Sequence, residues 1–297
     1  MRVPYFPGCA VKTTAVGFED SALAVAKELD IELVELPRWN CCGTVHSLTN
    51  DDLMHQIAPI RNFVRVQEMN EKGSLEDEYR LVTLCSICYN TLKRSNIVVK
   101  NDREKLKTIN DAMDREEEYL GKVKIIHFLE LLRDVGFEKV AQRVRNPLAG
   151  LKVSPYYGCL LLRPKVISID NLEQPQVLEN LLSVLDADVI DNPYKTQCCG
   201  SYHTVHRKDL VVELTYKILS YAVKSGAEVM ALSCPLCAFN LDQRQEDIQK
   251  KYRDFKKIPV LYLSQLIAIA FKLDEPIFDF TQNQVDPRPL LKEKGLI

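Results

Sequence analysis

The ten cysteines of the sequence fall into two sets of five that share one order. Each set consists of Gly-Cys, then Cys-Cys-Gly, then Cys-x-x-Cys, and no cysteine is left over. The first set is Cys9, Cys41, Cys42, Cys85 and Cys88, and the second is Cys159, Cys198, Cys199, Cys234 and Cys237. Thiolates are the ligands that zinc and iron–sulfur clusters take, so each set predicts a metal centre.

The number of thiols in each set bears on which metal they hold. A structural zinc ion is closed by four ligands, so five thiols leave one in surplus, and the surplus recurs in both sets. Adjacent cysteines converge poorly on one small ion, whereas two neighbouring irons of a cluster can take one each. Soft thiolates without a histidine at matching spacing therefore favour iron–sulfur. Zinc in at least one half, a redox disulfide and buried free thiols remain alternatives.

Composition sets limits on the function. The chain has 297 residues, 46% of them hydrophobic and 27% charged, which is typical of a folded protein with room for two domains. The net charge of −2 gives no basic field that would attract nucleic acid. No apolar run is long enough for a membrane span, and the N-terminal segment does not resemble a signal peptide. We therefore expect a cytoplasmic protein, in which disulfides are a poor use for ten thiols.

The two halves also match outside the cysteines, which indicates a duplicated domain of about 150 residues. Predicted strands at 2–6, 31–35, 80–84 and 123–126 alternate with helices near 13–29, 51–71, 89–120 and 128–144. The second half repeats this with strands at 153–157, 187–191, 229–233 and 259–261 and helices near 174–185, 208–225, 238–252 and 263–272. Such alternation predicts an α/β fold of two Rossmann-like domains with parallel sheets.

This fold is expected to bring the cysteines of each half to the same edge of its sheet. Cys9, Cys85, Cys159 and Cys234 each follow a predicted strand, and ligands of open α/β sheets bind at the carboxyl ends of the strands. Each set of five should therefore converge at that edge of its own sheet. We expect domains at 1–148 and 149–273, followed by an extended tail at 274–297 that contains several prolines.

The doubled pattern and its nearly complete coverage of the chain resemble the B subunit of heterodisulfide reductase, which has two cysteine-rich CCG domains. The resemblance implies one noncubane [4Fe-4S] cluster on each set of five cysteines. It implies a disulfide, that of coenzymes M and B or an analogue, bound between the clusters and cleaved with one electron from each side. It also implies two partners in the same complex, a ferredoxin-like C subunit together with a flavin-containing A subunit.

On this basis we expect a disulfide oxidoreductase subunit that is active only within its complex. The chain has no dinucleotide fingerprint or Walker loop, so flavin and nucleotide chemistry would belong to partners. The alternative is an electron-relay subunit of a flavin and iron–sulfur complex that does not itself reduce a disulfide.

Two histidines stand at the same offset after the two Cys-Cys-Gly motifs, His46 and His203. Histidine titrates near neutral pH, so they are candidate catalytic proton donors to the thiolates released from a disulfide. A duplicated loop histidine satisfied by the backbone is the alternative. His127 and His206 are predicted to be incidental, with His127 matching Leu261 in the other half.

Other polar residues near the cysteines are predicted to be structural. Asn90 and Asn240, just after each Cys-x-x-Cys, are expected at helix starts. Arg163 and Lys165 could pair with an anionic substrate, although exposure to solvent is the simpler prediction. The glycine of each Cys-Cys-Gly is expected to adopt positive φ or to allow a close approach of the backbone.

Overall fold

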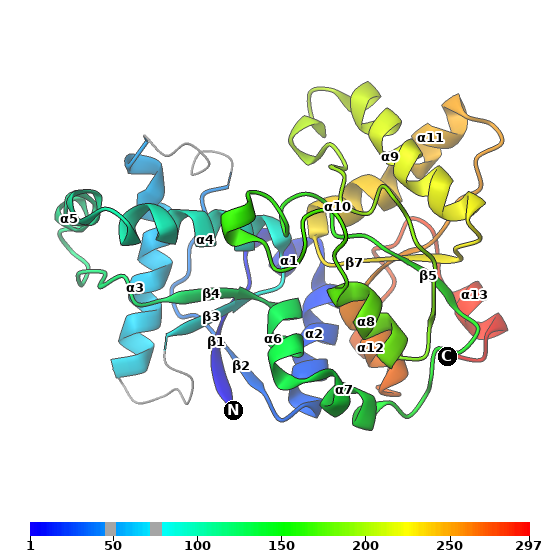
Figure 1. Cartoon of the computed structure of the whole chain (residues 1–297), viewed down its shortest axis with the longest axis horizontal. Helices are drawn as coiled ribbons and strands as arrows, with labels where there is room; N and C mark the ends of the chain where they lie inside the picture. The colour runs from blue at the N-terminus through cyan, green and yellow to red at the C-terminus, as the bar shows by residue number, and fades with distance from the viewer. Residues whose placement is uncertain (45–51, 72–78) are drawn as a thin grey trace.

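The computed structural model describes residues 1–44, 52–71 and 79–297 and shows two α/β domains, as predicted (Figure 1). The first contains strands β1 (Arg2–Phe6), β2 (Glu32–Glu35), β3 (Arg80–Thr83) and β4 (Lys124–His127). Its helices are α1 (Cys9–Thr13), α2 (Val16–Glu28), η2 (Met54–Gln56), α3 (Ile57–Glu71), α4 (Ser86–Lys100), α5 (Arg103–Ala112), α6 (Phe128–Val135) and α7 (Phe137–Arg143).

The second domain repeats this order. Its strands are β5 (Lys152–Pro155), β6 (Asp188–Val189), β7 (Val229–Leu232) and β8 (Val260–Tyr262). Its helical elements are η3 (Lys165–Ile167), α8 (Val177–Val184), η4 (Ser201–His203), α9 (Lys208–Lys224), α10 (Pro235–Ala238), the π-helical turn η5 (Phe239–Gln243), α11 (Gln245–Lys251), α12 (Leu263–Ala270), η6 (Glu275–Phe278) and α13 (Arg288–Glu293).

Each domain is built on a four-stranded, wholly parallel sheet. The strand orders are β2-β1-β3-β4 and β6-β5-β7-β8, so the two sheets have one topology. The central strand β7 is buried at every position, as expected for a parallel sheet whose two faces are covered by helices. The duplication predicted from the cysteine pattern is therefore a duplication of the fold.

Several predicted helices are broken, each at a recognisable signal. The helix expected at 89–120 is α4 and α5, because Asp102 accepts hydrogen bonds from the backbone N–H groups of Glu104 and Lys105 and caps a new helix. The helix expected at 128–144 is interrupted at Gly136, whose φ is 97°. The helix expected at 238–252 contains the π-helical turn η5, which adds one residue to the helix.

The C-terminal segment also differs from the expectation. The sequence predicts an extended chain from 274 onward, but this segment is helical at η6 and α13. The prolines that suggest an extended chain lie at the first turn of each helix, where the missing N–H costs nothing. Leu291 and Leu296 are buried, so this segment belongs to the packed structure.

The two domains exchange helix contacts across their interface. Helix α12 packs on α2, and α6 and α7 pack on α8, so the helices that end one domain cover the first long helix of the other (Figure 1). The hydroxyls of Ser21 and Ser264 lie 2.7 Å apart across this interface, and the rings of Phe18 and Tyr262 stack with centroids 4.1 Å apart. Burial of these helix faces fixes the position of one sheet relative to the other.

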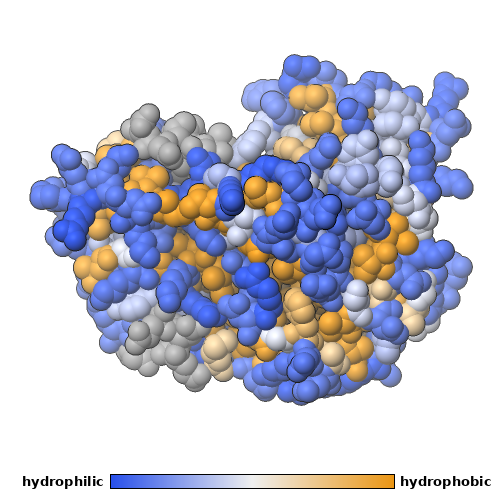
Figure 2. Space-filling model, viewed as in Figure 1, coloured by the Kyte–Doolittle hydropathy of each residue, from blue (hydrophilic) through white to orange (hydrophobic). Residues whose placement is uncertain are grey.

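On the face shown in Figure 2, hydrophilic residues predominate and separate the hydrophobic patches. Within the ranges given above, no helix combines the length and hydropathy needed to cross a bilayer.

Candidate metal centre

All the cysteines lie at the carboxyl ends of strands, as the sequence predicted. Cys9 begins α1 after β1, and Cys159 lies in the bend that follows β5. Cys85 and Cys234 occupy the position just before α4 and α10, at the ends of β3 and β7. The Cys-Cys pairs lie in the loops that follow β2 and β6. Since these strands are parallel and adjacent, each set of five converges on one sheet edge.

All the thiols except Cys9 are connected by a series of pairwise contacts that crosses from one domain to the other. In the first domain, hydrogen bonds join Cys41 to Cys42, Cys42 to Cys88 and Cys88 to Cys85. In the second, they join Cys159 to Cys198, Cys198 to Cys199, Cys199 to Cys237 and Cys237 to Cys234. The sulfurs of Cys199 and Cys237 are 3.5 Å apart. The two series meet where Cys85 hydrogen-bonds to Cys234.

Burial divides each set in the same way. The inner three thiols of each set are buried, namely Cys42, Cys85 and Cys88, and Cys199, Cys234 and Cys237. The outer two are more accessible: Cys9 and Cys41 are exposed, and Cys159 and Cys198 are half-buried. Each set therefore has a buried end at the domain junction and an end that reaches the surface.

The crowding of thiols strongly perturbs their acidity. Hydrogen bonds from Cys159 and Cys199 lower the pKa of Cys198 to about 2, while the hydrogen bond to Cys198 raises the pKa of Cys199 to about 12. At the junction, the hydrogen bond to Cys234, together with burial, raises the pKa of Cys85 well above its usual value. So many thiolates cannot ionise together unless cations replace their protons, which is what metal binding does.

Two glycines leave room beside the buried sulfurs. Gly8 has φ +77°, and a Cβ added there would lie 2.9 Å from Cys88 Sγ. Its counterpart Gly158 has φ +67°, and its Cβ would lie 3.4 Å from Cys237 Sγ. The glycines of the Cys-Cys-Gly motifs, Gly43 and Gly200, adopt φ +75° and +84°, which confirms the expectation of positive φ.

The donor set and the space beside it fit an iron–sulfur cluster better than a single ion. Within the part of the chain that the structure describes, no three His, Cys, Asp or Glu side chains are grouped to hold one metal ion. Four thiols of the first set and all five of the second are instead linked by pairwise contacts, and thiolates are the ligands of iron–sulfur clusters. That all ten serve as ligands stays a prediction.

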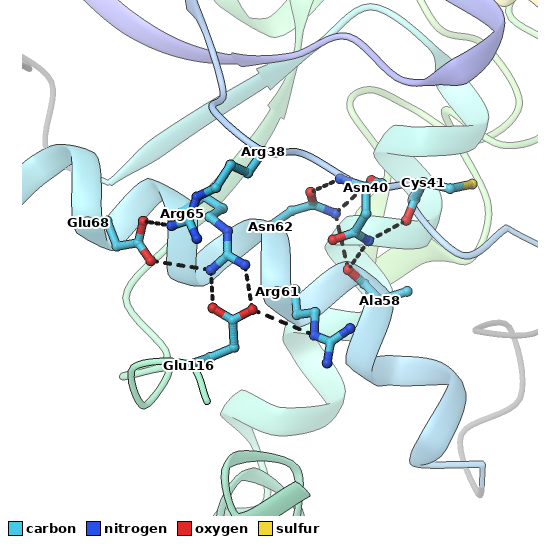
Figure 3. Close-up of polar contacts among 9 residues, drawn as sticks. All are labelled: Arg38, Asn40, Cys41, Ala58, Arg61, Asn62, Arg65, Glu68 and Glu116. Carbon is cyan, nitrogen blue, oxygen red and sulfur yellow. Dashed lines mark hydrogen bonds and ion pairs between the residues drawn. The ribbon is translucent and has the colours of Figure 1, made fainter. Parts of the chain in front are cut away.

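An amide cluster holds the first Cys-Cys loop in place (Figure 3). The buried side chain of Asn62 on α3 accepts a hydrogen bond from the backbone N–H of Asn40 and donates one to its carbonyl. The Asn40 side chain donates to the carbonyls of Cys41 and Ala58. The Cys41 sulfur points away from this cluster, so Asn62 acts on the loop backbone rather than on the thiol.

Replacing Asn62 by leucine should therefore loosen the first loop. It leaves the backbone groups of Asn40 unpaired, and we expect a loss of about 1–3 kcal/mol in the free energy of unfolding. Asn62→Asp, which keeps the acceptor but buries a carboxylate against the carbonyls of Asn40 and Ala58, should lose at least as much. Anaerobic urea unfolding of both variants tests this order, and equal stability of Asn62→Leu and the unsubstituted protein would contradict it.

The second loop is held by a buried ion pair instead. Lys195 Nζ lies 2.5 Å from Glu179 Oε1, and Glu179 also accepts a hydrogen bond from the Tyr157 hydroxyl. The carbonyl of Lys195 accepts hydrogen bonds from the backbone N–H groups of Tyr157 and Gly158, next to Cys159. These residues were missed by sequence reasoning, because nothing in their spacing marks a lysine as buried.

The two asparagines after the Cys-x-x-Cys motifs are not helix-start residues. Asn90 is buried within α4 and donates to the carbonyls of Leu160 and Arg163 in the other domain. Asn240 is buried and donates to the carbonyl of Cys199 and, at 3.5 Å, to its sulfur. Their offsets from the motif differ by one residue, and Asn240 lies in the π-helical turn η5.

Arg163, for which substrate binding is the less favoured alternative to exposure, is engaged by the protein itself. Its guanidinium donates to the Thr196 carbonyl at 3.1 Å and pairs with Glu173 at 3.0 Å. Lys165 is exposed at the start of η3, consistent with the simpler prediction.

Only one of the two predicted proton donors, His203, lies within the described residues. His46 lies outside the described residues. His203 is exposed at the end of η4, and no contact joins its ring to a cysteine in the described part of the chain. Its proposed role as a proton donor therefore rests on the sequence symmetry alone.

His127, predicted to be incidental, is a buried residue with a defined position. Its ring caps α6 by accepting from the Leu129 N–H, and its Nε2 lies 2.7 Å from the carbonyl of Leu84, the residue before Cys85. The sheet register places His127 opposite Thr83 and Tyr262 opposite Leu232. The counterpart of His127 is therefore Tyr262 rather than Leu261, because both end the last strand of their domain.

The buried imidazole predicts a pH dependence of stability. Burial lowers the pKa of His127 to about 4, so between that value and its usual 6.5 the unfolded chain binds more protons than the folded one. Stability should fall as the pH is lowered, by about 2 kcal/mol between pH 6.5 and 5 from this group. In His127→Asn, which can still cap α6, this part of the pH dependence of stability should vanish. Urea unfolding at several pH values tests this, and equal pH dependence in the variant and the unsubstituted protein would contradict it.

Comparisons with known proteins agree with the doubled architecture. The family model described as a cysteine-rich domain, CCG, matches residues 3–93 and 153–242. The 8-methylmenaquinol:fumarate reductase membrane anchor subunit of Wolinella succinogenes is 30% identical over 96% of this chain and 98% of its own length. The B subunit of a CoB-CoM heterodisulfide reductase of Methanosarcina acetivorans is 28% identical over 96% of this chain and 94% of its length.

Among solved structures, a hypothetical protein from Helicobacter pylori matches with a TM-score of 0.71 at 12% sequence identity. The match covers 92% of this chain and 49% of that protein, so the chain spans about half of it. This likeness shows the fold alone. Because the family model covers both halves and the relatives align over nearly the whole chain, the chain belongs to the cysteine-rich CCG family that includes the B subunits of heterodisulfide reductases.

Proposed function

We propose that this chain is an iron–sulfur electron-transfer subunit of an oxidoreductase complex, with one noncubane [4Fe-4S] cluster on each set of five cysteines. The observation that carries the proposal is the contact of Cys85 with Cys234 across the domain interface. It brings the two sets of cysteines, one from each domain, into contact with each other. Clusters bound there would supply reversible one-electron uptake and release.

The chain contributes rigidity and insulation to this arrangement. The inner thiols are buried, and the exchanged helices hold the two sheets in one relative position. The outer thiols reach the surface, where a partner protein can approach within electron-transfer distance. The names of the relatives as subunits support membership of a complex, and the partners expected from the resemblance are one ferredoxin-like and one flavin-containing protein.

Disulfide reduction is a second candidate activity of the same site. It is favoured by the contact between the two sets of cysteines, because a disulfide bound between them could take one electron from each side. The relatives named as heterodisulfide reductase subunits support it. The relative named for quinol:fumarate reduction, aligned over as much of the chain, supports relay without disulfide chemistry.

The two candidates can be separated in one experiment. The anaerobically purified protein is reduced with dithionite, freed of the reductant, and mixed with the disulfide of coenzymes M and B or with cystine. Relay alone predicts that the visible and EPR spectra of the reduced protein persist for as long as in buffer. Rapid reoxidation with release of two thiols per disulfide supports the reductase. A protein that takes up no electrons from dithionite contradicts the proposal itself.

A further inference from the structure

The second set of cysteines has a side-chain contact that orients an amide toward a sulfur. Asn240 is fully buried in η5, and its amide nitrogen donates to Cys199 Sγ at 3.5 Å and to the Cys199 carbonyl at 3.2 Å. The amide oxygen accepts a hydrogen bond from the Thr204 hydroxyl at 2.8 Å. The contact with Thr204 therefore fixes the orientation of the amide, with its nitrogen toward the sulfur.

The first set has no such contact among the described residues. Thr91 is the counterpart of Asn240, because each lies three residues after the second cysteine of its Cys-x-x-Cys. Thr91 is buried on α4, but its hydroxyl makes no hydrogen bond to Cys42, the counterpart of Cys199, or to any other described group. The neighbouring Asn90 donates its amide N–H groups to carbonyls of the other domain.

Two other kinds of polar group near the thiols occur in both domains. The backbone N–H of the glycine in each Cys-Cys-Gly motif donates to the first cysteine of the pair. Each domain also has one buried hydroxyl just before its Cys-x-x-Cys, on Thr83 or Ser233, that has no partner among the described residues. These groups do not distinguish the two sets, whereas the amide of Asn240 does.

A hydrogen bond to a ligand sulfur raises the reduction potential of the cluster that the sulfur holds. Reduction adds negative charge, and a donated N–H stabilises that charge. Asn240 and Cys199 are both buried, where a hydrogen bond is electrostatically stronger than in water. Water near the exposed outer thiols of the first set favours reduction there, but it does so without a fixed donor. We expect the oriented amide to have the larger effect.

We propose that Asn240 gives the centre in the second domain the higher reduction potential, so that an electron comes to rest there. The inference rests on the proposed function, because it needs a reducible cluster on each set. Cys9 and Cys41 are exposed, whereas the outer thiols of the second set are half-buried, so an electron from a partner enters at the first centre. It then crosses the Cys85–Cys234 junction. This transfer oxidises the first centre by one electron and reduces the second by one, and no proton moves.

The test is a redox titration of the anaerobically purified, cluster-loaded full chain, followed by EPR and visible absorbance. The unsubstituted protein should show two one-electron midpoints. We expect the electron to favour the second centre about tenfold, which is a separation of about 59 mV. Asn240→Thr, which introduces the residue that the first domain carries at this position, should lower the higher midpoint by about that amount. The lower midpoint should not change.

A reciprocal variant and a matched control accompany this substitution. Thr91→Asn should raise the lower midpoint and leave the higher one unchanged. The control is Asn192→Thr, because Asn192 is also fully buried in the second domain. Its amide donates to the Ile218 carbonyl at 3.1 Å and accepts from the Tyr194 N–H at 2.9 Å, with no contact to a thiol among the described residues. The control should keep both midpoints.

The possible outcomes separate this inference from the proposed function. Equal midpoints in the unsubstituted protein, or an unchanged higher midpoint in Asn240→Thr, would overturn the inference and leave the electron-transfer function standing. If Asn240→Thr binds no iron, an unchanged lower midpoint in Thr91→Asn overturns it instead. An equal shift in Asn192→Thr would assign the effect to the loss of any buried amide, against the inference. A protein that takes up no electrons from dithionite refutes the proposed function itself.

Discussion

Replacing Cys85 by serine is expected to remove the iron of the first set and to stop electron exchange between the two domains. Cys85 is buried, lies at the end of β3, and is the only thiol of its set that hydrogen-bonds to the second set among those described. Serine offers a harder, poorly ionised oxygen in place of a thiolate. Iron should fall from about eight to about four atoms per chain, since each [4Fe-4S] site accounts for four.

The control for this variant is the neighbouring residue. Ser86→Ala removes the hydrogen bond from the Ser86 hydroxyl to the Ser233 carbonyl in the other domain and leaves every thiol in place. It should cost about 1 kcal/mol of stability and retain its iron. Iron analysis with EPR of both variants tests the pair. A Cys85→Ser protein with its full iron content would show that this thiol is not a ligand.

Replacing Gly8 by alanine is expected to disrupt the first centre although no ligand is changed. The alanine Cβ would lie 2.9 Å from Cys88 Sγ, closer than real Cβ contacts allow, so the sulfur would have to shift. Positive φ adds about 1–2 kcal/mol for any residue with a Cβ. We expect a loss of unfolding free energy beyond that amount, together with loss of iron from the first set.

Gly150→Ala isolates the effect of the sulfur contact. Gly150 has the same φ, +77°, but a Cβ there meets nothing within 4 Å. This variant should lose only the backbone contribution of about 1–2 kcal/mol and keep both centres. If Gly8→Ala and Gly150→Ala retain equal amounts of iron, the space beside Cys88 is not needed for the metal.

Much of the architecture could be predicted because the cysteines lie close in sequence to the ends of the strands. The Gly-Cys pairs come shortly after β1 and β5, so strand ends and thiols are read from the same few residues. Alternating strands and helices then require parallel sheets, and the sheet edge that collects the cysteines follows. The two matching sheet orders confirm this reasoning.

What sequence reasoning missed depends on contacts between distant segments. Helices α12 and α6 pack on the opposite domain, and Asn90 is buried against the opposite domain. The periodicity of hydrophobic residues does not predict which surfaces make such interdomain contacts. The same holds for the meeting of Cys85 with Cys234. Matching His127 to Leu261 was wrong by one residue, because the sequence alone does not mark where each strand ends and only the sheet register identifies Tyr262.

Each set of five cysteines is proposed to hold one iron–sulfur cluster, with the two clusters beside each other. Iron and acid-labile sulfide quantitation with EPR, on anaerobically purified full chain, tests this most directly. We expect about eight irons and eight sulfides per chain. We also expect the signals to broaden by spin coupling when both centres are paramagnetic. Zinc without labile sulfide, or fewer than about four irons for each set, would contradict the two-cluster proposal.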